Sequence, residues 1–285
     1  MQKVLILGAK GMLGQELARE FRLHNFEVIG WDKEELDIVD FDTTVEKITK
    51  LMPDILINAV AYNLVDKIEE DAQIFELAKN INGEAVGNLA RICKANNITF
   101  VHYSSDYVFK GDNRDGYKEE DKLDPINKYG ETKAVGENQL LNIGGKFYII
   151  RLSKLFGKPS ASAGAKKSFV DQMIWLATDG GKNHLDLVDE EVGCITYAPD
   201  LAKLTYDILV NQKPFGIYHG ANSGVCSWYE WAKEIFKLKN INIDISPVSG
   251  DKFPRPAKRP LYSQLLNTKL PKQRNWEETL KEYLN

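Results

Sequence analysis

The stretch KVLILGAKGMLGQEL, residues 3–17, decides the fold of this chain. Its apolar run VLIL is typical of a buried strand, and helical spacing of apolar residues begins directly after the glycines that follow. A strand, a glycine turn and a helix N-terminus together form an anion site, because unpaired backbone N–H groups and the helix dipole face the ligand. The residues of the turn are Gly8, Gly11, Met12, Leu13 and Gly14.

The glycine spacing, GxxGxxG, differs from the GxGxxG fingerprint of dinucleotide-binding proteins. A tight turn that only lets a helix pack closely on a strand would also need glycines. The position of the turn, between the first strand and the first helix, favours a dinucleotide whose pyrophosphate lies against the backbone.

The second expected strand, residues 27–31, ends beside Asp32. A carboxylate at this place hydrogen-bonds the adenosine ribose and repels a 2′-phosphate, so Asp32 favours NADH, while the adjacent Lys33 softens that preference. The plain alternative is an acidic residue that faces water. We expect NADH or NADPH as cofactor, with NADH favoured.

Strands and helices alternate along the first half of the chain. This pattern predicts an α/β fold, a Rossmann-like doubly wound parallel sheet with helices on both faces. Strands are expected at residues 4–7, 27–31, 54–58, 99–105 and 147–153, and helices at 12–23, 72–95 and 127–141.

After Phe156 the pattern loosens into a glycine- and serine-rich stretch, residues 157–167, which indicates a domain boundary or a mobile lid. Shorter helices and strands follow, together with the proline-rich FPRPAKRP, residues 253–260, which must be extended. We expect a smaller C-terminal α/β substrate-binding domain. The NAD(P)-binding domain is predicted at 1–156, rejoined by about 194–222, and the substrate-binding domain at 157–193 and 223–285.

Composition argues against several classes of function. The 285 residues carry a net charge of −4 without blocks of like charge, so neither nucleic acid nor a membrane surface is an expected partner. No apolar run approaches the ~20 residues that span a bilayer. Cys93, Cys194 and Cys226 are odd in number and widely spaced, which predicts free thiols and a cytoplasmic protein. No Cys/His cluster has zinc-like spacing, so no metal site is expected.

Tyr129 and Lys133 stand four residues apart in YGETK, on one face of the helix expected there. A nearby ammonium stabilises a phenolate and lowers the pKa of the phenol, which would prepare Tyr129 to release its proton. Taken alone, such a pair is more often part of a solvated helix face.

With the glycine turn and SSDYVF, residues 104–109, this pair resembles the catalytic set of the extended short-chain dehydrogenase/reductase superfamily. The resemblance narrows to the dTDP-4-dehydrorhamnose reductase family and runs nearly end to end. It implies reduction of the 4-keto group of a nucleotide-linked 6-deoxyhexose, with dTDP-4-dehydro-L-rhamnose as the first candidate and dTDP-L-rhamnose as product. The matching segments are DILINAVAYNLVDKIEE, HYSSDYVFKG, YGETKAVGE, VGCITYAPDLA, GIYHGANSGVCSWYEWAKEIF and FPRPAKRPLYS.

The implied roles agree with what the reduction of a ketone needs. NAD(P)H would supply the hydride, and Tyr129 would give the proton to the carbonyl oxygen. Lys133 would lower the Tyr129 pKa and bond the nicotinamide ribose, while Ser105 would donate a hydrogen bond to the substrate oxygen. The plain alternative for Ser105 is a strand-end hydroxyl that caps its own backbone.

The resemblance implies further contacts, each with a plain alternative in packing, turn capping or solvent exposure. Arg259 is the candidate for the substrate diphosphate, because a guanidinium fits phosphate oxygens in a fork. Trp228 and Trp231, by contrast, are expected in the core. The other cofactor positions are Asp37, Ile38, Ala59, Ala61 and Tyr62, and the other substrate positions are Asp106, Lys154, Ser168 and Phe169.

Three departures from the family pattern fall in segments implied to line the sugar-nucleotide pocket. Lys154 stands where a tryptophan is usual, Ser168 replaces an asparagine, and Ile195 replaces a proline. An ammonium in place of an indole changes shape and charge together, so the sugar and the nucleotide base stay open.

Two alternatives stand beside the reductase. A sugar-nucleotide epimerase or dehydratase of the superfamily would keep NAD tightly bound, and a non-catalytic regulatory subunit resembling the beta subunit of methionine adenosyltransferase would share the fold. Parts of the family form a metal-bridged dimer through acidic positions, one of which falls on Glu16, but one glutamate gives no support for Mg²⁺. We expect a monomer or homodimer with a nucleotide-sugar substrate.

Overall fold

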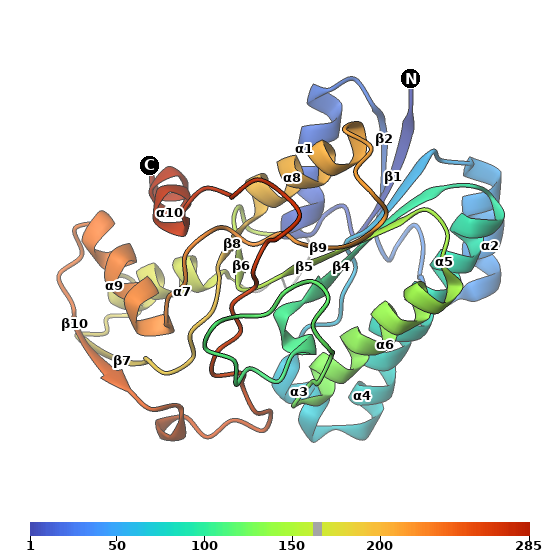
Figure 1. The fold of residues 1–285 in the computed structure, drawn as a ribbon. Helices are drawn as coiled ribbons and strands as arrows, with labels where there is room; N and C mark the ends of the chain where they lie inside the picture. The colour runs from blue at the N-terminus through green and yellow to red at the C-terminus, as the bar shows by residue number, and fades with distance from the viewer. Residues whose placement is uncertain (162–166) are drawn as a thin grey trace.

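The computed structural model describes residues 1–161 and 167–285. Six strands form a parallel sheet in the order β2-β1-β3-β4-β5-β9 (Figure 1). The strand order reverses between β1 and β3, so the topological switch point, where ligands of open α/β sheets bind, lies there. The strands are β1 (Lys3–Leu7), β2 (Glu27–Trp31), β3 (Ile55–Asn58), β4 (Thr99–Ser105), β5 (Phe147–Leu152) and β9 (Gly216–His219).

Helices cover both faces of the sheet, because successive side chains of each strand enter opposite cores. Val4 and Ile6 face one core, whereas Leu5 and Leu7 face the other. The predicted doubly wound α/β fold is therefore confirmed. The first core lies under α1 (Met12–Leu23) and α8 (Ala198–Val210), and the second under α2 (Phe41–Leu51), α5 (Ala85–Ala95) and α6 (Lys128–Ile143).

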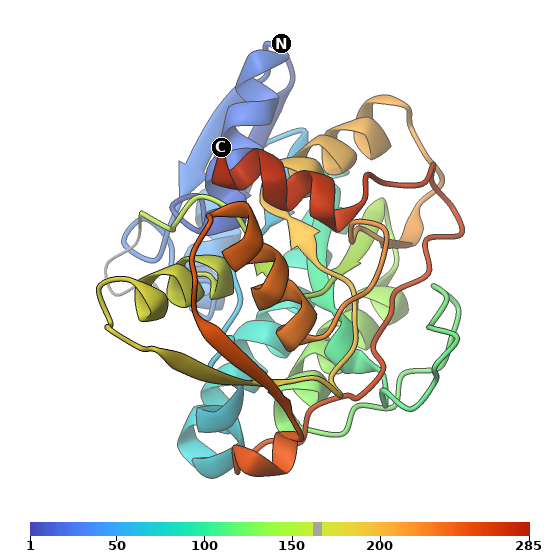
Figure 2. The same ribbon diagram turned by 90° about the vertical axis from the view of Figure 1, so that its left-hand side faces the viewer.

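A second group of elements has a separate core around Phe156, Trp231 and Trp276. Its two longer strands pair in parallel with each other and not with the large sheet. Figure 2 shows the last two helices of the chain side by side, and the first of them lies next to this strand pair. The elements are β6 (Leu155–Phe156), α7 (Phe169–Ala177), β7 (His184–Val188), β8 (Thr196–Tyr197), α9 (Trp228–Leu238), β10 (Asp244–Val248) and α10 (Trp276–Leu284).

Some elements differ from the expectation. The helix expected at 72–95 is α4 (Ala72–Lys79) and α5 joined by a π-helical turn, Asn80–Glu84. No expectation covers α2, whose polar sequence buries only Thr44 and Ile48, or the edge strand β10, which contains Pro247. The sequence also gives no signal for the short α3 (Val65–Glu70), β6 and β8.

Two irregular segments were expected after Phe156. Of the stretch 157–167, residues 162–166 lie outside the described residues, and residues 157–161 form no helix or strand. FPRPAKRP at 253–260 also forms neither, as its prolines predict.

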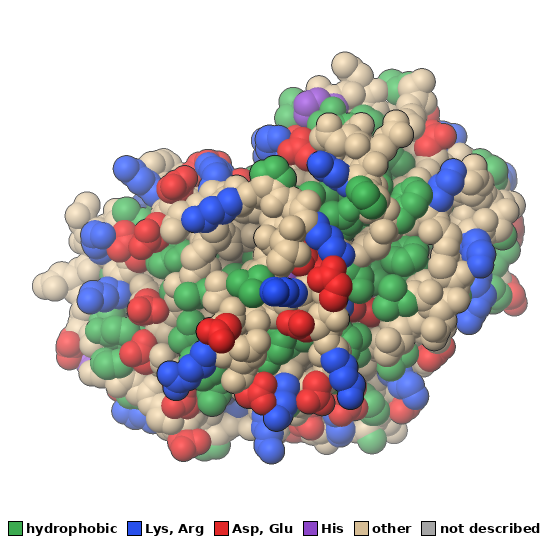
Figure 3. All heavy atoms as spheres, viewed as in Figure 1, with side chains coloured by type: hydrophobic (Ala, Val, Ile, Leu, Met, Phe, Trp, Pro, Cys, Tyr) green, Lys and Arg blue, Asp and Glu red, His purple; other side chains and the backbone are tan. Residues whose placement is uncertain are grey.

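The surface carries charges of both signs. On the face in Figure 3, basic and acidic side chains are interspersed over the whole outline. Across residues 1–161 and 167–285, no helix combines the length and the apolar character that crossing a membrane demands.

Candidate active site

The glycine turn joins β1 to α1, and its backbone leaves no room for a side chain at Gly14. Gly8 has φ +78°, in the left-handed region that favours glycine. A Cβ on Gly14 would overlap the Gly8 carbonyl oxygen. α1 begins after Gly11 without a side-chain cap, which leaves its first N–H groups to a ligand. These features fit the pyrophosphate of a dinucleotide. Met12 and Leu13 open the helix, and Leu13 is buried in the first core, so only its backbone can serve a ligand.

Asp32 ties the end of β2 to the glycine turn. Its Oδ2 accepts a hydrogen bond from the backbone N–H of Lys10 at 2.7 Å. Asp32 also lines a hollow of about 430 Å³ together with Ala9, Lys10 and Arg19. The predicted ribose-binding carboxylate thus lies at the carboxyl ends of β1 and β2, beside the turn.

Asp37 and Ile38 are engaged within the protein. Asp37 pairs with Lys33 at 3.6 Å and accepts a hydrogen bond from Val39 N at 3.3 Å, which is the turn-capping alternative. Ile38 is buried in the second core. Neither side chain is directed by these contacts toward the glycine turn.

The loop after β3 is held by Asn82, a buried residue of the π-helical turn. Asn82 accepts from Tyr62 N and donates to the Tyr62 carbonyl, each at 2.9 Å, and its Nδ2 also donates to Thr132 Oγ1 at 3.0 Å. Thr132 in turn donates to the Tyr129 carbonyl at 2.8 Å. The loop is therefore fixed to helix α6. The predicted cofactor residues on this loop are Ala59, Ala61 and Tyr62.

Tyr129 lies in the first turn of α6, where Asn127 caps the helix by accepting from Gly130 N at 2.8 Å. Burial raises the pKa of Tyr129 to about 12; the Asp106 carboxylate acts in the same direction, and a hydrogen bond with Ser105 opposes both. The phenol therefore holds its proton at neutral pH, as a general acid must. The predicted lowering of this pKa by Lys133 is wrong for this structure.

Lys133, one helical turn after Tyr129, makes its contacts with strand β4. The Lys133 side chain is buried, its Nζ donates to the Tyr103 carbonyl at 2.7 Å, and it lies 3.4 Å from His102 Nε2. Burial lowers the pKa of Lys133 to about 8, against the opposing effect of Glu137. The ammonium is thus directed at strand β4 and is itself destabilised.

Ser105 and Tyr129 lie together, as the prediction of a shared catalytic set requires. Ser105 Oγ donates to Asp106 Oδ1 at 3.0 Å and accepts from Tyr107 N at 3.2 Å, so the capping alternative is present too. Ser153 donates to Asp106 Oδ2 at 2.7 Å. Asp106 is buried, which raises its pKa against the hydroxyls that bond it. Its carboxylate is occupied by hydroxyl donors, and it positions Ser105.

Lys154, predicted at the sugar, has its ammonium enclosed by protein groups. Nζ donates to the carbonyls of Glu191 and Cys226 at 3.1 Å each and lies 4.7 Å from the centre of the Trp228 ring. Lys154 also has φ +43°, which is uncommon outside glycine. The family's indole position is therefore filled by a cation that is already solvated by carbonyls and an aromatic face.

Ser168 and Phe169 stand at the start of α7. Ser168 caps the helix by accepting from Asp171 N at 3.2 Å, so its hydroxyl has a structural role. The Phe169 ring packs against Trp228 and Trp231, at 4.8 Å from each. Trp231 is core, as expected, whereas Trp228 lies between the core and Lys154.

Arg259 reaches back to the sheet-bearing part of the chain. It donates to Asp66 Oδ2 at 2.8 Å and to the Ala257 carbonyl at 2.7 Å. Arg255, which the sequence reasoning passed over, forms a two-point ion pair with Glu191. Both arginines belong to FPRPAKRP, so the presence of Arg255 in this segment was the sequence signal that could have pointed to it.

Tyr107 lies against Tyr129, the candidate general acid. Its ring meets that of Tyr129 edge to face, with centres 5.6 Å apart. Burial raises the pKa of Tyr107; Arg259 opposes this, and Glu191 and Asp106 add to it. Tyr107 thus packs against Tyr129 and lies within the electrostatic influence of Arg259 and Glu191, which come from distant segments of the sequence.

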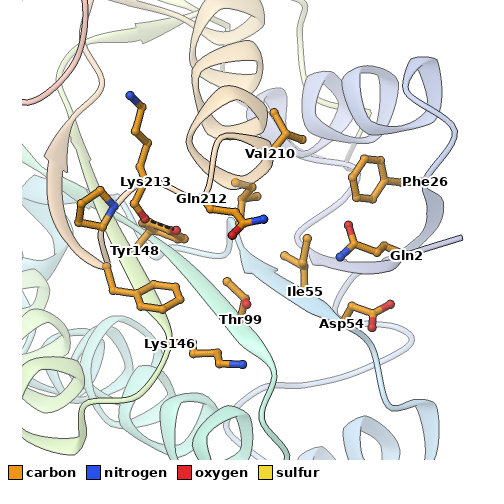
Figure 4. A pocket seen from close by; sticks show the side chains of 13 residues that line it. Gln2, Phe26, Asp54, Ile55, Thr99, Lys146, Tyr148, Val210, Gln212 and Lys213 are labelled. Atoms are coloured by element: carbon orange, nitrogen blue, oxygen red, sulfur yellow. Dashed lines mark hydrogen bonds between the residues drawn. The ribbon is translucent and has the colours of Figure 1, made fainter.

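Another hollow lies at the end of the sheet away from the glycine turn. It measures about 660 Å³ and is lined by Gln2, Asp54, Thr99 and Lys146, which stand at the amino ends of β1, β3, β4 and β5 (Figure 4). Open parallel sheets bind ligands at their carboxyl ends. The active-site candidate is therefore the group around Tyr129 and not this hollow.

Glu16, the metal position implied by the resemblance, is buried and pairs with Arg19 at 2.8 Å. Within the described part of the chain, no group of three or more His, Cys, Asp or Glu side chains is placed to hold a metal ion.

A glycine turn on a doubly wound sheet, with serine and tyrosine hydroxyls brought together beside a buried lysine, defines an oxidoreductase of the extended short-chain dehydrogenase/reductase class. The model of the family described as "RmlD substrate binding domain" matches residues 1–285. The chain belongs to the dTDP-4-dehydrorhamnose reductase family.

Three relatives illustrate the similarity. Spore coat polysaccharide biosynthesis protein SpsK of Bacillus subtilis (strain 168) is 34% identical, over 100% of this chain and 97% of SpsK. The dTDP-4-dehydrorhamnose reductase of Mycolicibacterium smegmatis is 33% identical, over 99% of this chain and 84% of that protein. The crystal structure of dTDP-4-dehydrorhamnose reductase from Bacillus anthracis str. Ames in complex with NADP is 32% identical, with a TM-score of 0.92 over 100% of this chain and 99% of that one.

Proposed function

We propose that this chain uses NAD(P)H to reduce the 4-keto group of a nucleotide-linked 6-deoxyhexose, and that the substrate is dTDP-4-dehydro-L-rhamnose. The observation that carries the proposal is the meeting of Ser105 and Tyr129 next to Asp106, with Lys133 one turn further on α6. The named reductases at 33% and 32% identity support the substrate and, through the NADP complex, a nicotinamide cofactor.

The bound cofactor supplies a hydride to the carbonyl carbon. Tyr129, whose raised pKa keeps it protonated, gives its proton to the carbonyl oxygen. The Ser105 hydroxyl donates to Asp106 in this structure, and on substrate binding it would turn to donate a hydrogen bond to the same carbonyl oxygen as negative charge develops there. The clamp of Asn82 on Tyr62 and Thr132 keeps the cofactor loop in register with the helix that carries the acid.

NADH is the preferred cofactor in this proposal. Asp32 places a carboxylate beside the turn, where it would meet a 2′-phosphate. Lys10 and Arg19 line the same hollow and reduce the preference without abolishing it. No Mg²⁺ site is proposed.

At the substrate end, Arg259 and Arg255 would hold the diphosphate, and Lys154, Phe169 and Trp228 would border the sugar. The proposed NAD(P)-binding domain keeps the bounds 1–156 and about 194–222, supported by the pairing of β9 with β5, and the remainder binds the substrate. The three free, buried cysteines support a cytoplasmic location. As in the sequence analysis, we expect the protein to be a monomer or homodimer.

The decisive experiment incubates the purified chain with dTDP-4-dehydro-L-rhamnose and NADH or NADPH and follows the loss of reduced-nicotinamide absorbance. Tyr129→Phe is expected to remove most of the activity and leave cofactor binding nearly unchanged, whereas Tyr148→Phe, near the amino end of β5, retains activity. No turnover by the unaltered chain would overturn the proposal. NAD retained through purification would point to an epimerase, and a co-purifying synthetase without turnover to a regulatory subunit.

A further inference from the structure

A buried histidine lies between the catalytic lysine and a buried asparagine. Asn58 and His102 are register partners on the parallel strands β3 and β4, and both side chains are fully buried. His102 Nε2 lies 3.4 Å from Lys133 Nζ, and its Nδ1 lies 3.4 Å from Asn58 Nδ2. The reduction described above gives neither His102 nor Asn58 a role.

We propose that Asn58 holds His102 in one tautomer and that His102, acting as a positioning residue, favours the uncharged form of Lys133. The catalytic consequence rests on the proposed reductase function, whereas the tautomer and the protonation state of Lys133 do not.

The amide of Asn58 has a fixed orientation. Its Oδ1 accepts a hydrogen bond from Val60 N at 3.1 Å, so its Nδ2 is the atom that faces His102. An amide NH₂ group only donates, and it needs an acceptor at His102 Nδ1. A neutral imidazole has one acceptor nitrogen, so its proton must then be on Nε2. Burial and the nearby Lys133 hold the pKa of His102 well below its usual range, which keeps the ring neutral.

The Nε2–H group points at Lys133 Nζ. An ammonium has only donors, so it would place N–H against N–H in a site without solvent. An uncharged amine can accept from Nε2–H and still donate to the Tyr103 carbonyl, so it satisfies every polar group of the chain from Asn58 to Tyr103. The hydrogen-bond pattern therefore favours the amine, in the same direction as burial of the side chain.

The charged and titratable groups around Lys133 are few. Glu137 on the same helix opposes the effect, His102 faces it from β4, and Tyr129 lies one turn before it. Glu137 is itself paired with Arg151, which limits its pull on Lys133.

A lysine that is part amine and part ammonium near neutral pH changes the charge of the buried site within the working pH range. Lys133 lies one helical turn after Tyr129, so this charge is part of the environment of the general acid. Asn58 and His102 would thus set the pH at which the site loses that charge.

Asn58→Asp tests the proposal because it replaces only the side-chain NH₂ group of Asn58, with a carboxylate oxygen. An aspartate at this position can still accept from Val60 N, but it needs a donor from His102 Nδ1. The ring should change to the Nδ1–H tautomer, its Nε2 should accept from the Lys133 ammonium, and the pKa of Lys133 should rise by about one unit or more. Ring ¹⁵N shifts report the tautomer, and Lys133 ¹³Cε shifts, assigned by comparison with Lys133→Met, report the pKa.

The matched control is Asn58→Asp in a His102→Leu background. The added carboxylate is present there but cannot act through the ring, so the rise in the Lys133 pKa should be much smaller. Thermal unfolding of each variant shows that it is folded. An Nδ1–H tautomer in the unaltered protein, or an equal rise with and without His102, would overturn the proposal.

Failure of this proposal can be distinguished from failure of the proposed reductase function. The NMR measurements need neither substrate nor turnover, so they decide the tautomer and the Lys133 pKa even in an inactive protein. If the unaltered chain is an active reductase, the pH profile of kcat in Asn58→Asp should move upward with the Lys133 pKa. A profile that stays in place while the pKa moves would remove the catalytic part of the proposal alone.

Discussion

Arg151 and Glu137 form a buried two-point ion pair that joins α6, the helix that carries Tyr129 and Lys133, to the sheet. Arg151 Nε lies 2.9 Å from Glu137 Oε1, and Nη2 lies 2.6 Å from Oε2. The side chains are 2% and 0% exposed. Arg151 Nη1 lies 3.1 Å from the Glu119 carbonyl and 3.3 Å from His219 Nε2, so the guanidinium is surrounded by acceptors. Helix α6 is thereby fixed to β5 one turn after Lys133.

Removing one partner of this pair should destabilise the protein strongly. Glu137→Leu leaves the Arg151 charge buried and uncompensated, and we expect the free energy of unfolding to fall by about 3–5 kcal/mol. Urea unfolding followed by circular dichroism measures the loss. The double variant Glu137→Leu/Arg151→Met buries no charge and should lose less than Glu137→Leu alone. Equal losses would mean that the pair contributes packing and not charge compensation.

Lys133 makes stability depend on pH in the alkaline range. Its folded pKa of about 8 lies below the ordinary 10.5, so between these values the unfolded chain binds more protons than the folded one. Stability from this group therefore rises with pH across that window, by roughly 3 kcal/mol in total. Lys133→Met removes this pH-dependent contribution. The free energy of unfolding of the variant minus that of the unaltered protein should therefore be highest below pH ~8 and decline toward pH ~10.5.

The control for this prediction is Lys122→Met, which removes an exposed lysine. Its stability relative to the unaltered protein should stay level across the same window in urea unfolding. If the difference in free energy of unfolding between Lys133→Met and the unaltered protein is also constant across this pH window, the Lys133 ammonium is not destabilised by burial.

The sheet was predictable from the sequence because parallel strands buried on both faces are continuous apolar runs. VLIL at residues 4–7 and TFVHYSS at 99–105 are strands as expected. The amphipathic α2 was not foreseen, since threonines and charges hide its two buried residues. The break in the helix at 80–84 depends on Asn82 bonding Tyr62, twenty residues away, and no local pattern reports such a contact.

The candidate site could be anticipated where residue type alone suggests the chemistry, as for Ser105, Tyr129 and the glycines. It was not predictable where a side chain's partner decides its state. The sequence suggested that Lys133 lowers the Tyr129 pKa, but burial of the phenol and the nearby Asp106 carboxylate raise this pKa instead. His102 gave no signal, because its importance depends on strand register with Asn58.

His184 should respond to pH at the β7–β10 pair. Its Nδ1 lies 2.8 Å from Asp244 and its Nε2 lies 3.3 Å from Asp186. Both hydrogen bonds raise the pKa of His184, and the bond to Asp244 has the larger effect. A raised pKa means that the ring stabilises the strand pair fully below its unfolded value of about 6.5 and loses this effect as pH rises through the folded pKa.

Titration of the His184 ring protons by NMR measures this pKa directly. Asp244→Asn should lower it, because the first hydrogen-bond acceptor loses its charge. Asp115→Asn, in an exposed loop, is the control and should leave the midpoint in place. An unchanged midpoint in Asp244→Asn would show that the contact does not persist in solution.

Arg259 should contribute to substrate binding and little to the chemical step. It would contact the diphosphate, which does not change in the reaction, so Arg259→Ala should raise KM by about 10–100-fold with kcat nearly unchanged. The matched control is Asp66→Ala, which breaks the same ion pair but keeps the cation. Steady-state kinetics with varied sugar nucleotide should give Asp66→Ala an unchanged or lower KM, because the freed guanidinium can turn to the phosphates. If Asp66→Ala raises KM as much as Arg259→Ala does, the arginine only fixes the 253–260 segment to α3.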